Sequence, residues 1–174
     1  KKGYASTSDF SPQAIQATVE AACNIAKFTA EDSFCGLADA QLMAHNVRDL
    51  NLYHPWDVSV EAAADIAKQC EAAALAVDPR RISNSEGASV STSEGHFVYA
   101  NTHGFLGAYP SSRHSISCSV IATEAGAMQR DYWYTNAREA KDLLTPAIVG
   151  QIAGERTVRR LGTRAIKTGQ YPVL

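Results

Sequence analysis

The sequence has no long hydrophobic run and no segment typical of a secretory signal. Its apolar stretches, such as residues 72–77, are only a few residues long, whereas a membrane-spanning helix needs about 20. Lys1–Tyr4 lacks the apolar core of a signal peptide. With 45% hydrophobic and 20% charged residues, the composition excludes disordered and collagen-like classes. We therefore expect a soluble, cytoplasmic protein with no membrane contact.

The sequence also lacks the motifs of metal, nucleotide and nucleophile sites. No two histidines are four residues apart, no cysteines form a CxxC pair, and no GxxxxGK[ST] or GxGxxG loop is present. Gly87–Ser91 looks like a GxSxG nucleophile elbow, but its last position is serine and the strand-to-helix context is missing. We predict no catalytic residue, metal ligand or cofactor in this chain.

Two alternatives stay open for the histidines and cysteines. His96, His103 and His114 could bind a metal ion if the predicted sheet brought them together. Their serine, glycine and aromatic neighbours suit positions in turns and at the edge of the sheet equally well. The four scattered cysteines are typical of small buried residues in a reducing compartment, and the alternative is a functional or disulfide-bonded thiol.

Charge is divided unevenly along the chain. The net formal charge is −2, and the basic excess lies near the C-terminal end, at Arg156, Arg159, Arg160, Arg164 and Lys167. Nucleic-acid-binding surfaces usually have a stronger basic footprint with interleaved aromatic residues. We interpret this cluster as the cationic end of a helix, which the helix dipole favours, and expect no direct nucleic-acid partner.

Capping residues and apolar spacing predict three helices. The first covers residues 12–30, the second ends before Asp78-Pro79, and the third covers about 145–161. The expected N-caps are Ser11 for the first helix and Asp57 or Ser59 for the second. Residues 31–58 lack helical periodicity but are too apolar for a flexible linker, so we expect an ordered connection.

Between the second and third helices the sequence consists of short alternating runs and turn residues. Ser85-Glu86-Gly87 returns as Ser93-Glu94-Gly95, and each glycine can take the positive φ that a hairpin turn or a bulge needs. We predict an antiparallel meander of about five strands, at residues 88–92, 96–101, 105–109, 112–122 and 128–137.

This order of elements predicts an α+β fold, because helices and strands are segregated along the chain. We expect an N-terminal helical α/β region at residues 1–78, the meander at 79–144, and the third helix with the start of a strand at 145–174. Lys1–Phe10 and Tyr171–Leu174 both have the character of strand fragments. We therefore expect further sequence on both sides, including a C-terminal domain.

Two features of the meander suggest binding. Tyr132 and Tyr134 are predicted on one face with Trp133 on the other, and this pattern suits either structural packing or a peptide-binding edge or subunit interface. Arg113, beside a turn, either forms an ion pair or holds a carboxylate. We expect either the tyrosine face or the face with Ile116, Cys118 and Val120 to lack cover from this chain.

Several motifs in collinear order resemble the TldD/PmbA family. They are NSEGA at residues 84–88, GHFVYAN at 95–101, YPSSRHS at 109–115, QRDYWY at 129–134 and AGERTVRRLG at 153–162. Residues 24–32 and 51–57 resemble the PmbA (TldE) branch in particular. Each piece is short, but together they cover essentially the whole chain.

The resemblance implies a bacterial subunit of a cytoplasmic metalloprotease. TldD-type and PmbA-type chains form a heterodimer that cleaves small or unfolded peptides, matures peptide-antibiotic precursors and degrades an antitoxin. A homodimer is the alternative assembly. The family's other name, modulator of DNA gyrase, is indirect and requires no DNA site.

The same resemblance places the metal elsewhere. In the TldD branch a zinc-binding HExxxH helix follows the strand that begins here at residues 172–174, and the PmbA branch does not keep that motif as a metal site. Zinc is therefore expected only in the TldD-type partner. Our candidate substrate or interface residues are Asn84, Ser85, Glu86, Gly87, Arg113, Tyr132, Trp133 and Tyr134. The alternative function is a non-catalytic binding or scaffold protein that uses the meander edge for partner proteins.

Overall fold

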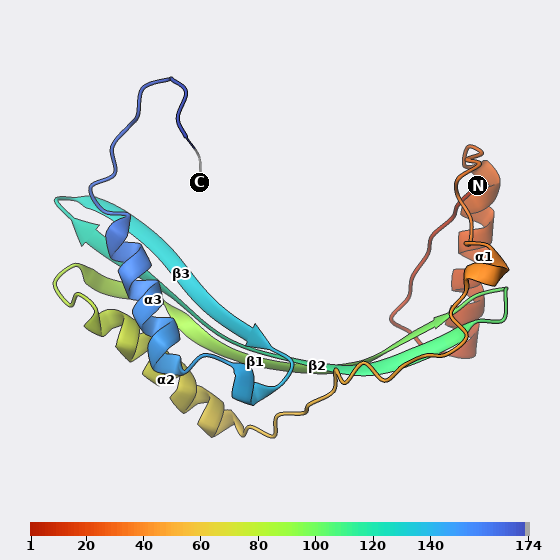
Figure 1. Cartoon of the computed structure of the whole chain (residues 1–174), viewed down its shortest axis with the longest axis horizontal. Helices are drawn as coiled ribbons and strands as arrows, with labels where there is room; N and C mark the ends of the chain where they lie inside the picture. Colours follow the sequence, from red (N-terminus) through yellow and green to blue (C-terminus); the bar gives the residue numbers. More distant parts are fainter. Residues whose placement is uncertain (173–174) are drawn as a thin grey trace. The chain divides into compact units, whose positions relative to one another are not determined.

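The computed structural model describes residues 1–172 and divides the chain into two compact units. The first unit comprises Lys1–Asn46 and Ala100–Phe105, and contains α1 (Pro12–Phe28) and the short 3-10 helix η1 (Ala40–Leu42). The second comprises Val47–Tyr99 and the chain from Leu106 onward. Its elements, in chain order, are α2 (Val60–Ala76), most of β1 (Ile82–Ala100), β2 (Leu106–Glu124), β3 (Ala127–Ala137), η2 (Ala140–Asp142) and α3 (Pro146–Arg159) (Figure 1).

The three predicted helices are confirmed, and each begins at a hydroxyl-bearing cap. In each case the cap hydroxyl accepts a hydrogen bond from the backbone N–H three residues on, at 3.3 Å for Ser11, 3.2 Å for Ser59 and 3.4 Å for Thr145. Such bonds satisfy N–H groups that have no partner within the helix. Of the two caps considered for α2, the structure uses Ser59.

The strand predicted at Lys1–Phe10 is wrong. This segment has no regular structure and runs beside α1, where Gly3 contacts the backbone of Ala22 and Ala26. The hydroxyl of Thr29 donates to the carbonyl of Lys2 at 3.1 Å. The backbone here is held by a helix and not by a neighbouring strand. At the other end, Tyr171 and Pro172 are not in a strand, and the rest of the strand predicted there lies outside the described residues.

The second unit is built on one antiparallel sheet with strand order β1-β2-β3. A tight turn at Ala125-Gly126 joins β2 to β3, and both residues have positive φ, at 48° and 79°, as a two-residue hairpin of primed type requires. The register of that pair places Ser117 opposite Tyr134. β1 and β2 are joined by side-chain pairs that include Ser89–Ser117 at 2.9 Å. The α+β class is therefore confirmed.

The sheet has three long strands and not five short ones. The strands predicted at 88–92 and 96–101 are both parts of β1, and those at 105–109 and 112–122 are both parts of β2. Gly95 does not have a positive φ, so no hairpin forms there. Pro110 does not break β2, because its nitrogen faces the same side as the Ser112 N–H, which bonds the Leu52 carbonyl at 2.9 Å. The missing N–H therefore removes no hydrogen bond to β1.

One face of the sheet is buried under helices α2 and α3 (Figure 1). Alternate residues of β2 on this face are at most 3% exposed: Ser112, His114, Ile116, Cys118, Val120 and Ala122. The helices contribute Cys70, Ala74, Val149 and Ala153 to the same core. Of the two faces named as alternatives for lacking cover, the one with Ile116, Cys118 and Val120 is therefore covered by this chain. No helix among residues 1–172 is long and apolar enough to cross a membrane.

Candidate functional site

The other face of the sheet, here called the open face, carries hydroxyl groups and tyrosines. Serines of β1 and β2 pair across the strands, with 2.9 Å between the hydroxyl oxygens of Ser89 and Ser117 and of Ser91 and Ser115. Such cross-strand pairs stabilise an antiparallel sheet. They also leave a row of small polar groups on the exposed side of the two strands.

Two tyrosines of β3 lie beside these serines. The rings of Tyr132 and Tyr134 are stacked, with centroids 6.3 Å apart and 19° between their planes. Both side chains remain about half exposed, at 57% and 49%. Trp133 lies on the helix-covered face, where the Arg156 guanidinium sits 5.1 Å from its ring centroid. The alternation therefore separates the two tyrosines, which face solvent, from the tryptophan, which packs inward.

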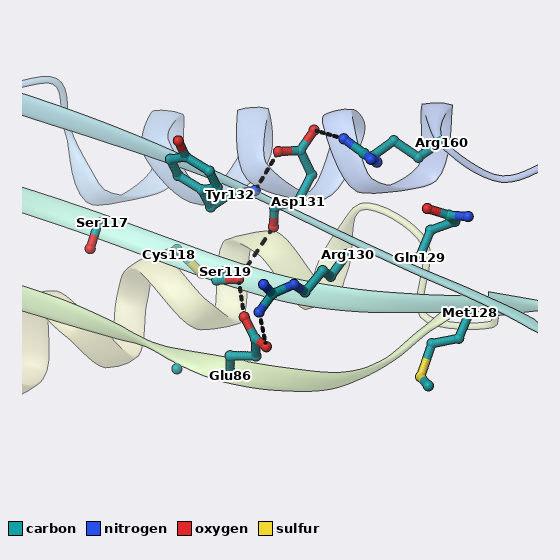
Figure 2. A pocket seen from close by; sticks show the side chains of 11 residues that line it. Glu86, Ser117, Cys118, Ser119, Met128, Gln129, Arg130, Asp131, Tyr132 and Arg160 are labelled. Atoms are coloured by element: carbon teal, nitrogen blue, oxygen red, sulfur yellow. Dashed lines mark hydrogen bonds and ion pairs between the residues drawn. The ribbon is translucent and has the colours of Figure 1, made fainter. Parts of the chain in front are cut away.

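A pocket of about 650 Å³ opens at one end of this face (Figure 2). Glu86 of β1 accepts hydrogen bonds from the Ser119 hydroxyl at 2.7 Å and from the Arg130 guanidinium at 2.6 Å. The Ser119 bond, and then the Arg130 bond, hold the pKa of Glu86 below its usual value. The pocket is lined by Glu86, Gly87, Ser117, Cys118, Ser119, Met128, Gln129, Arg130, Asp131, Tyr132 and Arg160.

Asp131 forms the second ionic cluster of this pocket. Its side chain is only 9% exposed and lies 3.3 Å from Arg156 and 3.7 Å from Arg160, both on or just after α3. It also accepts a hydrogen bond from the backbone N–H of Tyr132 at 2.8 Å (Figure 2). A buried carboxylate needs such partners, because burial without them is costly. Asp131 thus fixes the end of α3 against β3.

A bulge in β1 brings Glu86 to the open face. The carbonyl of Arg81 pairs with the N–H of Thr123, and Ser89 pairs with Ser117. From Arg81 to Ser89 the chain advances eight residues, whereas β2 advances only six from Ser117 to Thr123. The first segment therefore has two more residues than its partner. Extra residues in one strand change which face of the sheet the following side chains point to. The φ of 110° at Gly87 marks the irregular position. Of the two alternatives for Gly87, the bulge fits the structure and the hairpin turn is wrong, and the expected positive φ is observed.

Side-chain hydrogen bonds hold the residues before this bulge. The Ser85 hydroxyl donates to the Ser119 carbonyl at 3.3 Å and accepts from the Gly87 N–H at 2.8 Å. The amide oxygen of Asn84 accepts from the Ser85 N–H at 2.9 Å. Asn84 and Ser85 therefore shape the bulge, and Glu86 is the residue of this segment that presents a charged group to the pocket.

At the opposite end, Arg113 lines a second pocket of about 370 Å³ together with Tyr132, Tyr134 and Asn136. Of the candidate residues, Glu86, Gly87 and Tyr132 therefore share one pocket, and Arg113, Tyr132 and Tyr134 share the next. Reasoning from the sequence missed Ser119, Arg130, Asp131 and Arg160. The alternating serines of β2, at Ser115, Ser117 and Ser119, are the signal in the sequence for this face.

The histidines and cysteines do not form a metal site in the described chain. Within residues 1–172, no three His, Cys, Asp or Glu side chains form a group that could hold a metal ion. His114 is fully buried, and its ring nitrogens lie 2.8 Å from the Thr92 hydroxyl and 2.8 Å from the His54 carbonyl. All four cysteines are free, with Cys70 and Cys118 buried.

Comparison with known proteins agrees with the motifs. Residues 53–161 match the sequence profile of the PmbA/TldA metallopeptidase central domain. The chain is 47% identical over 174 residues to metalloprotease PmbA of Escherichia coli and to a PmbA homolog of Haemophilus influenzae. It spans 38% of the length of each of these relatives.

Solved structures show the same fold. A candidate modulator of DNA gyrase from Bacteroides thetaiotaomicron is similar with a TM-score of 0.79 at 25% identity, over 95% of this chain and 38% of that chain. TldE from Thermococcus kodakarensis is similar in fold, with a TM-score of 0.51 at 14% identity, over 91% of this chain and 34% of that chain. The chain belongs to the PmbA/TldA metallopeptidase family, and residues 53–161 correspond to its central domain.

Proposed function

We propose that this chain is the N-terminal and central part of a PmbA/TldE-like subunit in a cytoplasmic TldD–TldE-type metalloprotease. In this proposal the complex cleaves small or unfolded peptides, including peptide-antibiotic precursors and antitoxins, and this subunit contributes structure and substrate binding. The observation that carries the proposal is the open face, with its serine pairs, its exposed tyrosines and its two adjoining pockets.

The dimensions of the open face suit an extended peptide. The two pockets share Ser117 and Tyr132 in their linings and therefore adjoin along β2 and β3, and we call them together the groove. The stretch of β2 from Arg113 to Ser119 is roughly 20 Å long at about 3.4 Å per residue, which matches a peptide of about six residues. Serine hydroxyls can bond a peptide backbone irrespective of its sequence, and tyrosines supply large contact areas at low entropic cost.

The zinc ion of the metalloprotease is expected in the TldD-type partner. The donor groups of residues 1–172 do not fit a zinc site, so no step of the reaction is assigned through a metal held by this chain. The role proposed here is to bind and orient the peptide.

The test uses the full-length protein together with a TldD-type partner. Replacing Tyr132 and Tyr134 with serine is expected to raise the KM for an unfolded peptide about tenfold and to leave kcat nearly unchanged, because ground-state and transition-state contacts are lost equally. Tyr4→Ser is the matched control, since Tyr4 is also exposed but lies in the first unit. Cleavage should need the partner and stop when a chelator is added. If it does so but the double variant has the KM of wild type, the substrate-binding role of this subunit is wrong.

A scaffold protein is the second candidate, and the edge of the sheet favours it. β1 is an edge strand whose residues from Ser91 to Ala100 are exposed, and exposed edges accept strands of partner proteins. If the full-length protein and its partner cleave no peptide under any condition, the scaffold function replaces the one proposed.

A further inference from the structure

Two arginines without acidic partners lie at the end of the open face away from Glu86. Arg113 and Asn136 line the groove described above, and the adjoining pocket of about 190 Å³ is lined by Arg113, Asn136, Ala137 and Arg138. Neither of these two pockets has an acidic residue in its lining. Among residues 1–172, the side chains of Arg113 and Arg138 form no ion pair.

These arginines lie together at the end of the β2–β3 pairing, where both line the smaller pocket. His114 pairs with Ala137 at the end of β3, and Arg113 and Arg138 are the next residues on the two segments. The two segments are still joined there, since the Ser112 hydroxyl donates to the Arg138 carbonyl at 2.8 Å and the Arg138 guanidinium donates to the Ser112 carbonyl at 3.3 Å. Two like charges held near each other repel, and a bound anion relieves that repulsion.

The other end of the same face is neutralised. Arg130 is paired with Glu86 at 2.6 Å, and Arg160, which also lines the pocket there, lies 3.7 Å from Asp131. The open face thus has one end where cations are matched within the chain and one end where two cations are not. An unmatched pair of guanidinium groups beside a pocket complements an anionic group from outside the chain.

We propose that Arg113 and Arg138, with the amide of Asn136, form a carboxylate-binding subsite that anchors one end of an extended peptide in the groove. The guanidinium fork matches a carboxylate in geometry and charge. This inference rests on the proposed function, because it takes the open face as the peptide-binding surface. The carboxylate comes either from the C-terminus of the peptide or from an Asp or Glu side chain.

The tyrosines agree with this placement. Side chains two residues apart on one side of an extended peptide are about 6.7 Å apart, and the ring centroids of Tyr132 and Tyr134 are 6.3 Å apart. A peptide anchored at Arg113 therefore lays alternate side chains on the two rings as it runs toward Glu86.

The experiment measures peptide binding by the full-length protein with fluorescence anisotropy. Three labelled, unstructured peptides are compared: one with a free C-terminus, the same peptide amidated, and the amidated peptide with one internal glutamate. Wild-type protein is expected to bind the free acid about tenfold or more tightly than the amide, as for the loss of one charge-assisted hydrogen-bonded pair. If only the peptide with the internal glutamate binds more tightly than the amidated peptide, the carboxylate that the subsite binds is that of an acidic side chain.

The variants separate a specific anchor from general charge. Arg113→Gln is expected to weaken binding of the free acid about tenfold, to the level of the amide, and Arg113→Lys to recover part of the loss. Arg159→Gln is the matched control, because Arg159 is an exposed arginine of the same unit whose ion pair with Glu155 is long, at 3.9 Å. An equal loss in both Gln variants would mean that only net charge matters and would overturn the subsite.

The remaining outcomes are also decisive. If wild-type protein binds all three peptides equally and Arg113→Gln changes nothing, the subsite is wrong while the proposed function stands. If no peptide binds, the proposed function fails, and the carboxylate subsite is tested with acetate alone. Acetate is then expected to raise the melting temperature of wild type more than that of Arg113→Gln, and equal shifts would overturn the subsite. If Arg113→Gln instead splits a peptide-free homodimer, the occupant is a second copy of the chain and the peptide subsite is wrong.

Discussion

Gly150 on α3 packs directly against the carbonyl oxygen of Cys70 on α2. A Cβ atom at Gly150 would overlap that oxygen and come within 2.9 Å of the Ala73 Cβ. One turn further, a Cβ at Gly154 would lie 2.6 Å from the Ala74 carbonyl oxygen. These two glycines let α2 and α3 approach closely, and the helix pair covers the buried face of β2.

This contact predicts that Gly150→Ala destabilises the protein. In an exposed helix the same change would stabilise by about 1 kcal/mol, because alanine is the better helix former. Here the helices must separate, so we expect a net loss of about 1–3 kcal/mol, as for other overpacked cores. Chemical denaturation measures it, with Gly95→Ala as control, since no atom lies near the Cβ position there. A more stable Gly150→Ala variant would contradict the close contact.

The local parts of the fold could be predicted from the sequence. Ser11, Ser59 and Thr145 each precede a periodic apolar run, and a cap acts through its own neighbouring N–H groups, so nearby residues suffice to predict α1, α2 and α3. The turn at Ala125-Gly126 lies between the strands predicted at residues 112–122 and 128–137, because there too the decisive groups are neighbours in the chain.

The contacts between distant residues could not be predicted in the same way. Glu86 and Arg130 are 44 positions apart, and they meet only because a bulge changes which side of β1 Glu86 occupies. Gly87 and Gly95 stand in similar Ser-Glu-Gly segments, yet only Gly87 has a positive φ. The difference arises from pairing with β2, which local sequence does not contain.

The two glycines therefore make a matched pair for a second prediction. Neither has an atom near its Cβ position, so substitution tests backbone conformation alone. Gly87→Val is expected to cost about 1–2 kcal/mol, because a β-branched residue is strained at a φ of 110°. Gly95→Val is expected to be neutral or stabilising, since valine favours an extended strand. Equal losses of unfolding free energy in both variants would contradict the bulge.

A third prediction concerns the pH dependence of stability. The Ser119 hydroxyl and then Arg130 lower the pKa of Glu86 from its usual 4.5. A carboxyl whose pKa is lowered in the folded state stabilises it above the unfolded pKa, and this contribution is lost as the pH falls through the folded value. Glu86→Gln is therefore expected to flatten the fall in melting temperature below about pH 4.5.

Its control is Glu31→Gln, an exposed glutamate with no ion pair among residues 1–172. Melting temperatures are compared between pH 6 and pH 3.5 for both variants. If the melting temperature of Glu86→Gln falls toward low pH as steeply as that of wild type, Ser119 and Arg130 do not favour the charged form of Glu86. Added salt should also reduce the difference, because Arg130 is 70% exposed.

The fourth prediction is a coupling between Asp131 and Arg156. Arg156→Met removes the cation 3.3 Å from a carboxylate that is 9% exposed and leaves Arg160, at 3.7 Å, as its one cationic partner among residues 1–172. It also removes the guanidinium above the Trp133 ring. We expect a loss of about 1–3 kcal/mol, as for a buried charged group that loses its hydrogen-bonded partner. Asp131→Asn should cost less, since the amide oxygen can still accept from the Tyr132 N–H.

In the double variant the buried carboxylate and its cation are gone together, so the total loss should be smaller than the sum of the single losses by about 1 kcal/mol. Urea denaturation followed by tryptophan fluorescence measures the free energy of unfolding of the wild type, the two single variants and the double variant. Trp133 lies at the site and contributes to this signal. Arg159→Met on the same helix is the control, with an expected effect near zero because its side chain is 78% exposed. Additive losses in the cycle would mean that Arg156 stabilises α3 by packing on Trp133 alone, and that Asp131 is balanced by Arg160 and the backbone.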